Sequence, residues 1–107
     1  MTPHPVDLDD AVERAARAAN RARVLPFGWV GLPVELYGRW YVVILGRPPY
    51  YRIAAVYSIR PDSRLRRIVR WPAGLPDHAF ALLRTHPTRR VEYPGLREGW
   101  VMTTARD

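Results

Sequence analysis

The clearest pattern in the chain is an amphipathic segment from about Leu8 to Arg23. At about 100° per residue its apolar side chains fall within an arc of about 160°, and its charged side chains lie on the other side. The apolar arc contains Leu8, Ala11, Val12, Ala15, Ala16, Ala18, Ala19 and Ala22. We expect a helix whose alanine-rich face packs closely on a sheet.

The charged side of this segment carries a row of three arginines, Arg14, Arg17 and Arg21. Asp10 and Glu13 precede the first two at i,i+4 spacing, which allows ion pairs within the helix. The row is therefore only partly neutralised. A pattern of this kind is typical of a solvated helix face.

Residues that favour β-structure dominate from Val34 to Trp71, after a connector rich in proline and glycine at 26–33. The pattern predicts three strands, at 34–45, 50–60 and 65–71. Short turn sequences separate them, so we expect sequential antiparallel neighbours in a meander.

A second, shorter helix is expected from Asp77 to about Thr85, ended by Pro87. The remaining tail is expected to be irregular, with short strands at 91–93 and 100–103 as a further interpretation. The fold class is therefore α+β: an N-terminal amphipathic helix packed on an antiparallel meander of three or more strands, a short second helix and an irregular C-terminal segment. Residues 1–107 are expected to form one small basic domain.

Period-two alternation divides the predicted strands between an apolar face and a solvent-exposed face. The apolar face is expected to hold Val34, Leu36, Trp40, Val42, Ile44, Tyr51, Ile53, Ala55, Tyr57 and Ile59. The exposed face collects arginine and tyrosine, namely Tyr37, Arg39, Tyr41, Arg52, Arg60, Arg66 and Arg70. Arg67 is the exception, because it lies on the otherwise apolar side.

Tyrosine interleaved with arginine on a sheet is a pattern that binds single-stranded nucleic acid, with bases stacked on the rings and guanidinium groups on phosphates. We interpret the exposed face as a candidate site of this kind, with Arg39, Arg52, Arg66 and Arg70 on phosphates and with Tyr37 and Tyr41 as stacking partners. The alternative is ordinary cross-strand pairing of arginine and tyrosine without a ligand.

The net charge of the chain supports the interpretation as a nucleic-acid-binding face. The 107 residues carry a formal net charge of +7, and all 17 basic residues are arginine, whose planar fork suits phosphate. Codon usage in a GC-rich genome also explains the missing lysines. From Val34 to Trp71 eight arginines face two acids, so the excess charge is concentrated in the sheet region.

No apolar run has the length of a membrane span, no signal peptide is evident and the chain has no cysteine. A cytoplasmic protein that does not bind membranes is expected.

Residues with catalytic or metal-binding potential are few. The sequence contains no GxSxG, GxxxxGK[ST] or GxGxxG motif and no lysine. His78 and His86 lie at the two ends of the second predicted helix, without the spacing of a metal motif. We therefore predict no catalytic set, no cofactor and no metal.

Residues 51–71, YRIAAVYSIRPDSRLRRIVRW, resemble the central hairpin of RelE/ParE-type toxins, a family that cleaves ribosome-bound messenger RNA or poisons gyrase. The resemblance covers about a fifth of the chain and includes no specific motif. The order α-β-β-β-α also resembles the double-stranded-RNA-binding domain in outline, without the basic helix-start motif of that family after Gly74.

Three functional hypotheses follow. The first is a small non-enzymatic protein that binds nucleic acid, either RNA or single-stranded DNA, or that associates with a nucleoprotein complex. The second is a protein-interaction module, such as an inhibitor, adaptor or assembly subunit, with a protein partner or a second copy of itself. Its expected aromatic anchors are Trp29, Tyr50, Trp71 and Trp100. The third is a RelE/ParE-like ribonuclease toxin.

Overall fold

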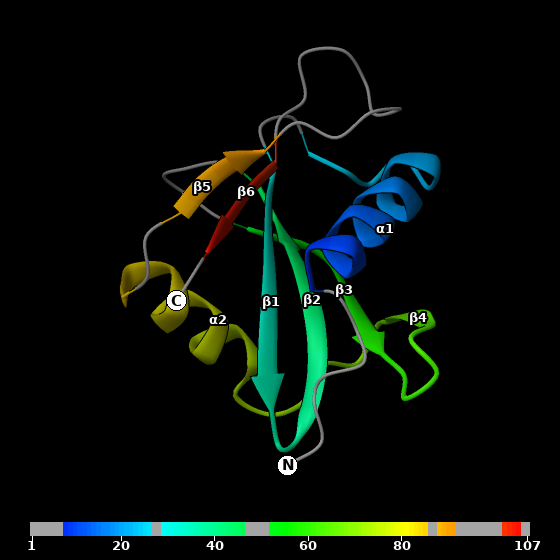
Figure 1. Cartoon of the computed structure of the whole chain (residues 1–107). Coiled ribbons are helices and arrows are strands. Elements are labelled where there is room, and N and C mark those ends of the chain that lie inside the picture. The colour runs from blue at the N-terminus through cyan, green and yellow to red at the C-terminus, as the bar shows by residue number, and fades with distance from the viewer. Residues whose placement is uncertain (1–7, 27–28, 47–51, 86–87, 92–101, 106–107) are drawn as a thin grey trace.

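A computed structural model describes residues 8–26, 29–46, 52–85, 88–91 and 102–105. Two helices and six strands follow one another as α1 (Leu8–Arg21), β1 (Val30–Leu36), β2 (Arg39–Leu45), β3 (Ile53–Ile59), β4 (Leu65–Ile68), α2 (Leu75–Thr85), β5 (Thr88–Val91) and β6 (Met102–Ala105). The strands form one sheet in the order β4-β3-β2-β1-β6-β5 (Figure 1). The antiparallel meander runs from β1 to β4, and β6 pairs in parallel with β1. The predicted α+β fold is confirmed.

The first predicted strand, 34–45, is in fact part of a hairpin: it covers the end of β1, the turn and all of β2. Its two strands, β1 and β2, meet at a two-residue turn of Tyr37 and Gly38, whose φ angles are 54° and 76°. Positive φ at both central residues is the geometry of a type I′ turn, which matches the twist of the flanking strands. Tyr37 is a residue type that rarely adopts this conformation, so in the sequence only Gly38 indicates a turn here.

This hairpin changes the assignment of faces. Val34 pairs with Tyr41, so the two side chains share one face of the sheet instead of lying on opposite faces. Val34 and Leu36 therefore lie on the α2 side, away from Trp40, Val42 and Ile44. Correspondingly, β1 begins at Val30, inside the segment that was expected to be a connector.

Helix α1 covers one face of the sheet with small side chains (Figure 1). Its wholly buried residues are Ala11, Val12, Ala15, Ala16 and Ala19. They pack with Trp29, Val42, Ile44, Ala55 and Tyr57. The amphipathic pattern thus predicted the packed face of α1 correctly, and its bounds agree to within two residues at the C-terminal end.

Helix α2 covers the opposite face of the sheet, around Leu75 and Ala79. The strand residues of this second core are Val30, Leu32, Val34, Tyr41, Val43, Leu45 and Val56. The prediction of a solvent-exposed sheet face is therefore wrong for the central strands. The reason is that α2 returns across the sheet, which the alternation within single strands does not reveal.

A β-bulge interrupts the pairing of β2 with β3. Ile44 pairs with Ala55 and Leu45 pairs with Ile53, which leaves Ala54 without a partner across the strands. Ile53 consequently joins the α2 side of the core, contrary to the expected alternation.

The short strand β4 forms one edge of the sheet. It ends at Ile68, three residues before the predicted end, and Val69 is 89% exposed. A short edge strand rich in charge resists pairing with other chains. At the other edge, β5 and β6 overlap the two short strands suggested for the tail. None of the helices among the described residues has the length and apolarity needed to cross a bilayer.

Candidate functional site

The two tyrosines of the predicted binding face occupy different environments. Tyr41 is only 6% exposed and belongs to the core beneath α2, so its ring is not available for stacking. Tyr37 is 76% exposed in the β1–β2 turn, and its hydroxyl donates a hydrogen bond to the Ala73 carbonyl oxygen at 3.3 Å. The structure does not bring these rings together as a platform.

The five arginines of that face are all exposed, but they are dispersed. Trp40 pairs with Ile59, which places the following Arg60 and the preceding Arg39 at the same end of the sheet. Arg52 precedes the seven-residue strand β3, and at about 3.3 Å per residue it lies about 26 Å from Arg60 along the chain. The remaining two lie on the edge strand and in the segment that follows it, Arg66 and Arg70.

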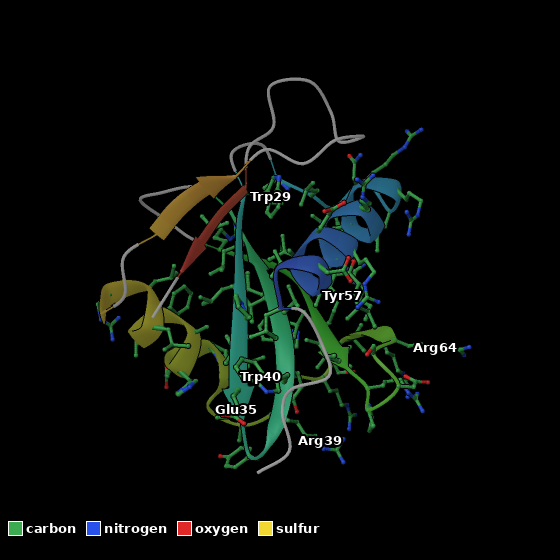
Figure 2. The ribbon with its side chains drawn as sticks, in the orientation of Figure 1. Trp29, Glu35, Arg39, Trp40, Tyr57 and Arg64 are labelled. Carbon is green, nitrogen blue, oxygen red and sulfur yellow. The ribbon has the colours of Figure 1, made fainter. Side chains whose placement is uncertain are left out.

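A second group of basic side chains surrounds a groove between α1 and strands β3 and β4. The groove encloses about 280 Å³ and is lined by Arg14, Arg17, Ala18, Arg21, Tyr57 and Leu65. Arg67 belongs to the same region, because it pairs with Tyr57 across the strands. Figure 2 shows Tyr57 beside α1 and Arg64 directed away from the sheet at the β3–β4 end.

Two of the groove arginines are held by neighbouring groups. Arg14 Nε lies 2.9 Å from Asp10 Oδ2, and its Nη1 donates to the Ser63 carbonyl oxygen at 2.9 Å, which ties α1 to the β3–β4 turn. Arg17 Nη2 lies 2.7 Å from Glu13 Oε2. These contacts fix the direction of the two long side chains.

The other two arginines, Arg21 and Arg67, are exposed and form no ion pair within the described part of the chain. Both act electrostatically on the phenol of Tyr57. Two guanidinium groups near Tyr57 therefore remain available to an anion.

Tyr57 is 4% exposed and lies close to both of these charges. Burial raises the pKa of its hydroxyl above the ordinary value of 10.0, against the opposing effect of Arg67 and Arg21. The hydroxyl consequently keeps its proton at neutral pH and is able to donate a hydrogen bond.

The raised pKa of Tyr57 predicts a loss of stability at alkaline pH. The unfolded chain releases the tyrosine proton near pH 10.0 but the folded chain releases it at higher pH, so the contribution is complete below pH 10.0 and declines above it. In urea denaturation at about pH 8 and about pH 11, the wild type should lose more stability than Tyr57→Phe. An identical pH dependence of the two proteins would contradict this account of the hydroxyl.

The groove continues into the basic edge of the sheet. We call the combined region the edge surface, defined by Arg14, Arg17, Arg21, Arg60, Arg64, Arg66, Arg67 and Arg70. Successive residues of β4 point to opposite faces of the sheet. Arg67 pairs with Tyr57 on the face covered by α1, and Arg66 pairs with Ser58 on the other face. The described carboxylates near these arginines are Asp10, Glu13 and Asp62, so the eight arginines leave an excess of five positive charges.

The expected aromatic anchors and histidines contribute little to this surface. Trp29 is buried in the α1 core and is not an anchor, whereas Trp71 is 41% exposed. His78 is exposed in the first turn of α2. Tyr50, Trp100 and His86 lie outside the described residues. No group of three metal-binding side chains occurs within the described ranges.

Sequence reasoning missed the groove although both of its signals were present. The row Arg14, Arg17 and Arg21 follows one side of a helix, and Arg67 breaks the apolar alternation of its strand. Neither signal identifies a groove by itself. Their combination depends on α1 lying beside β3 and β4, which is a tertiary contact.

Comparisons with known proteins provide no family for this chain. No protein-family model matches it, and no significant match was found among curated proteins or solved structures.

Proposed function

We propose that the protein binds nucleic acid, either RNA or single-stranded DNA, through the edge surface. The observation that supports this proposal is the concentration of an excess of five positive charges on one helix and one sheet edge. Arginine forks bind phosphate oxygens in a bidentate manner, and a row of them suits the regular phosphates of a backbone.

This binding depends mainly on phosphate contacts. Tyr41 is buried, so the stacking platform expected from the sequence does not contribute. Trp71 follows Arg70 and is 41% exposed, which provides one aromatic surface for a base. We therefore expect weak sequence preference and a steep dependence of affinity on salt.

The proposal predicts a specific effect of three edge arginines. The triple variant Arg64→Gln/Arg66→Gln/Arg70→Gln should bind a labelled oligonucleotide of about 15 nucleotides at least about tenfold more weakly at about 50 mM salt. The plot of log affinity against log salt should become shallower by about 2, because three phosphate contacts are lost. Fluorescence anisotropy with RNA and DNA versions of the same sequence measures both quantities.

A matched control removes the same charge elsewhere. Arg23, Arg52 and Arg84 are exposed and lie outside the edge surface. The triple variant Arg23→Gln/Arg52→Gln/Arg84→Gln should retain most of the affinity. Equal losses in the two triple variants would contradict the assignment of the site to the edge surface.

The same samples distinguish the alternatives. No binding by the wild type at about 50 mM salt would overturn the proposal, because electrostatic binding is strongest at low salt. The exposed neighbours Val69 and Trp71 would then favour the protein-interaction hypothesis. Cleavage of the RNA, seen on a denaturing gel, would instead support the ribonuclease hypothesis.

A further inference from the structure

We infer that the groove between α1 and strands β3 and β4 binds a terminal phosphate of the nucleic acid. This inference rests on the proposed function and adds a specific subsite to the edge surface. The phosphomonoester would lie between Arg21 and Arg67, above the phenol of Tyr57.

The size of the groove favours a small group. Its volume of about 280 Å³ is just below the range of pockets that enclose a whole drug-sized ligand. A phosphate with its attached sugar is smaller than such a ligand. The apolar side chains of Ala18 and Leu65 line part of the groove, where they would contact the sugar.

The charge of the groove matches a phosphomonoester. Arg14, Arg17 and Arg21 line the groove, and Arg67 lies beside it as the cross-strand partner of Tyr57. Arg14 and Arg17 pair with carboxylates. An excess of two positive charges remains. A phosphomonoester carries about −1.5 to −2 charges at pH 7, whereas an internal phosphodiester carries one. The end of a phosphorylated strand therefore neutralises the groove more completely than its interior does.

The available donors also suit this group. Arg21 and Arg67 make no ion pair within the described residues, so their forks need not break an existing contact to bind an anion. Tyr57 is protonated at neutral pH and offers a hydroxyl donor. Arg14 and Arg17 are held by Asp10 and Glu13, so they line the groove as fixed side chains whose charge is already paired.

The test compares three oligonucleotides of one sequence: 5′-phosphorylated, 3′-phosphorylated and unphosphorylated. The wild type should bind one of the phosphorylated forms about tenfold more tightly than the unphosphorylated form, as charge-assisted hydrogen bonds predict. The double variant Arg21→Gln/Arg67→Gln should lose this preference. Arg21→Lys/Arg67→Lys, which keeps the charge but not the fork, should retain only part of it.

Edge arginines outside the groove provide the matched control. Arg66→Gln/Arg70→Gln should weaken binding of all three oligonucleotides by a similar factor and leave the preference intact. Circular dichroism establishes that each variant is folded. The four substituted arginines are all exposed, so the core is not altered.

Three results would overturn the inference, and the first of them separates it from the proposed function. Equal, salt-dependent binding of the three oligonucleotides by the wild type would overturn the phosphate subsite and leave the proposed function in place. A preference that survives in Arg21→Gln/Arg67→Gln would show that the groove is not the subsite. The absence of binding to any oligonucleotide at about 50 mM salt would overturn both proposals.

Discussion

Replacing Tyr41 with alanine is expected to lower the free energy of unfolding by about 3–5 kcal/mol, as for other large aromatic side chains removed from a core. Tyr41 is 6% exposed and lies in the core beneath α2, together with Val34 and Val43. The substitution removes a ring from a close-packed layer between sheet and helix, where the neighbours relax only in part. Urea denaturation followed by circular dichroism measures the change.

Tyr37→Ala is the matched control for this prediction, because Tyr37 is 76% exposed and makes one long hydrogen bond to Ala73. Its free energy of unfolding should change by less than about 1 kcal/mol. If Tyr41→Ala instead retained wild-type stability and lost affinity for nucleic acid, Tyr41 would be a stacking residue and α2 would not cover this face of the sheet.

The second large effect concerns the core beneath α1. Trp29→Ala is expected to cost about 3–5 kcal/mol, because Trp29 is wholly buried and is the largest side chain of that core. The helix contributes mainly alanines to this layer, so no long flexible side chain from α1 is available to fill the resulting cavity. Thermal and urea denaturation should both show the loss.

Trp71→Ala provides the comparison for this substitution. Trp71 is 41% exposed in the segment between β4 and α2, and its removal should cost no more than about 1 kcal/mol. Similar losses for Trp29→Ala and Trp71→Ala would contradict the burial of Trp29. A normal stability of Trp29→Ala would also restore this residue as a candidate anchor for a protein partner.

The sequence was sufficient to predict the elements whose patterns are local. Helix α1 is defined by its alanine arc and α2 by a short apolar face, and both agree with the structure. The β1–β2 hairpin was missed because Tyr37 adopts a positive φ that its residue type does not signal. Val34, Glu35 and Leu36 were consequently assigned to the wrong face relative to β2.

The candidate site was predicted less well, for a different reason. The alternation of apolar and polar residues along a strand indicates which side chains share a face, but it does not indicate what covers that face. Tyr41 was expected in solvent and is buried by α2, which lies far along the chain. The arginines of the edge strand needed no such information, since an edge strand is exposed, and Arg66 is exposed as predicted.

The alanine contact between α1 and the sheet also determines how this sequence is free to diverge. Ala11, Ala15, Ala16 and Ala19 are wholly buried, and a larger side chain at any of them would push the helix away from the strands. Descendants of this chain should therefore keep alanine, glycine or serine there while the outward positions change freely. Side-chain volume, more than hydrophobicity, is the property by which distant relatives of this helix should be recognised.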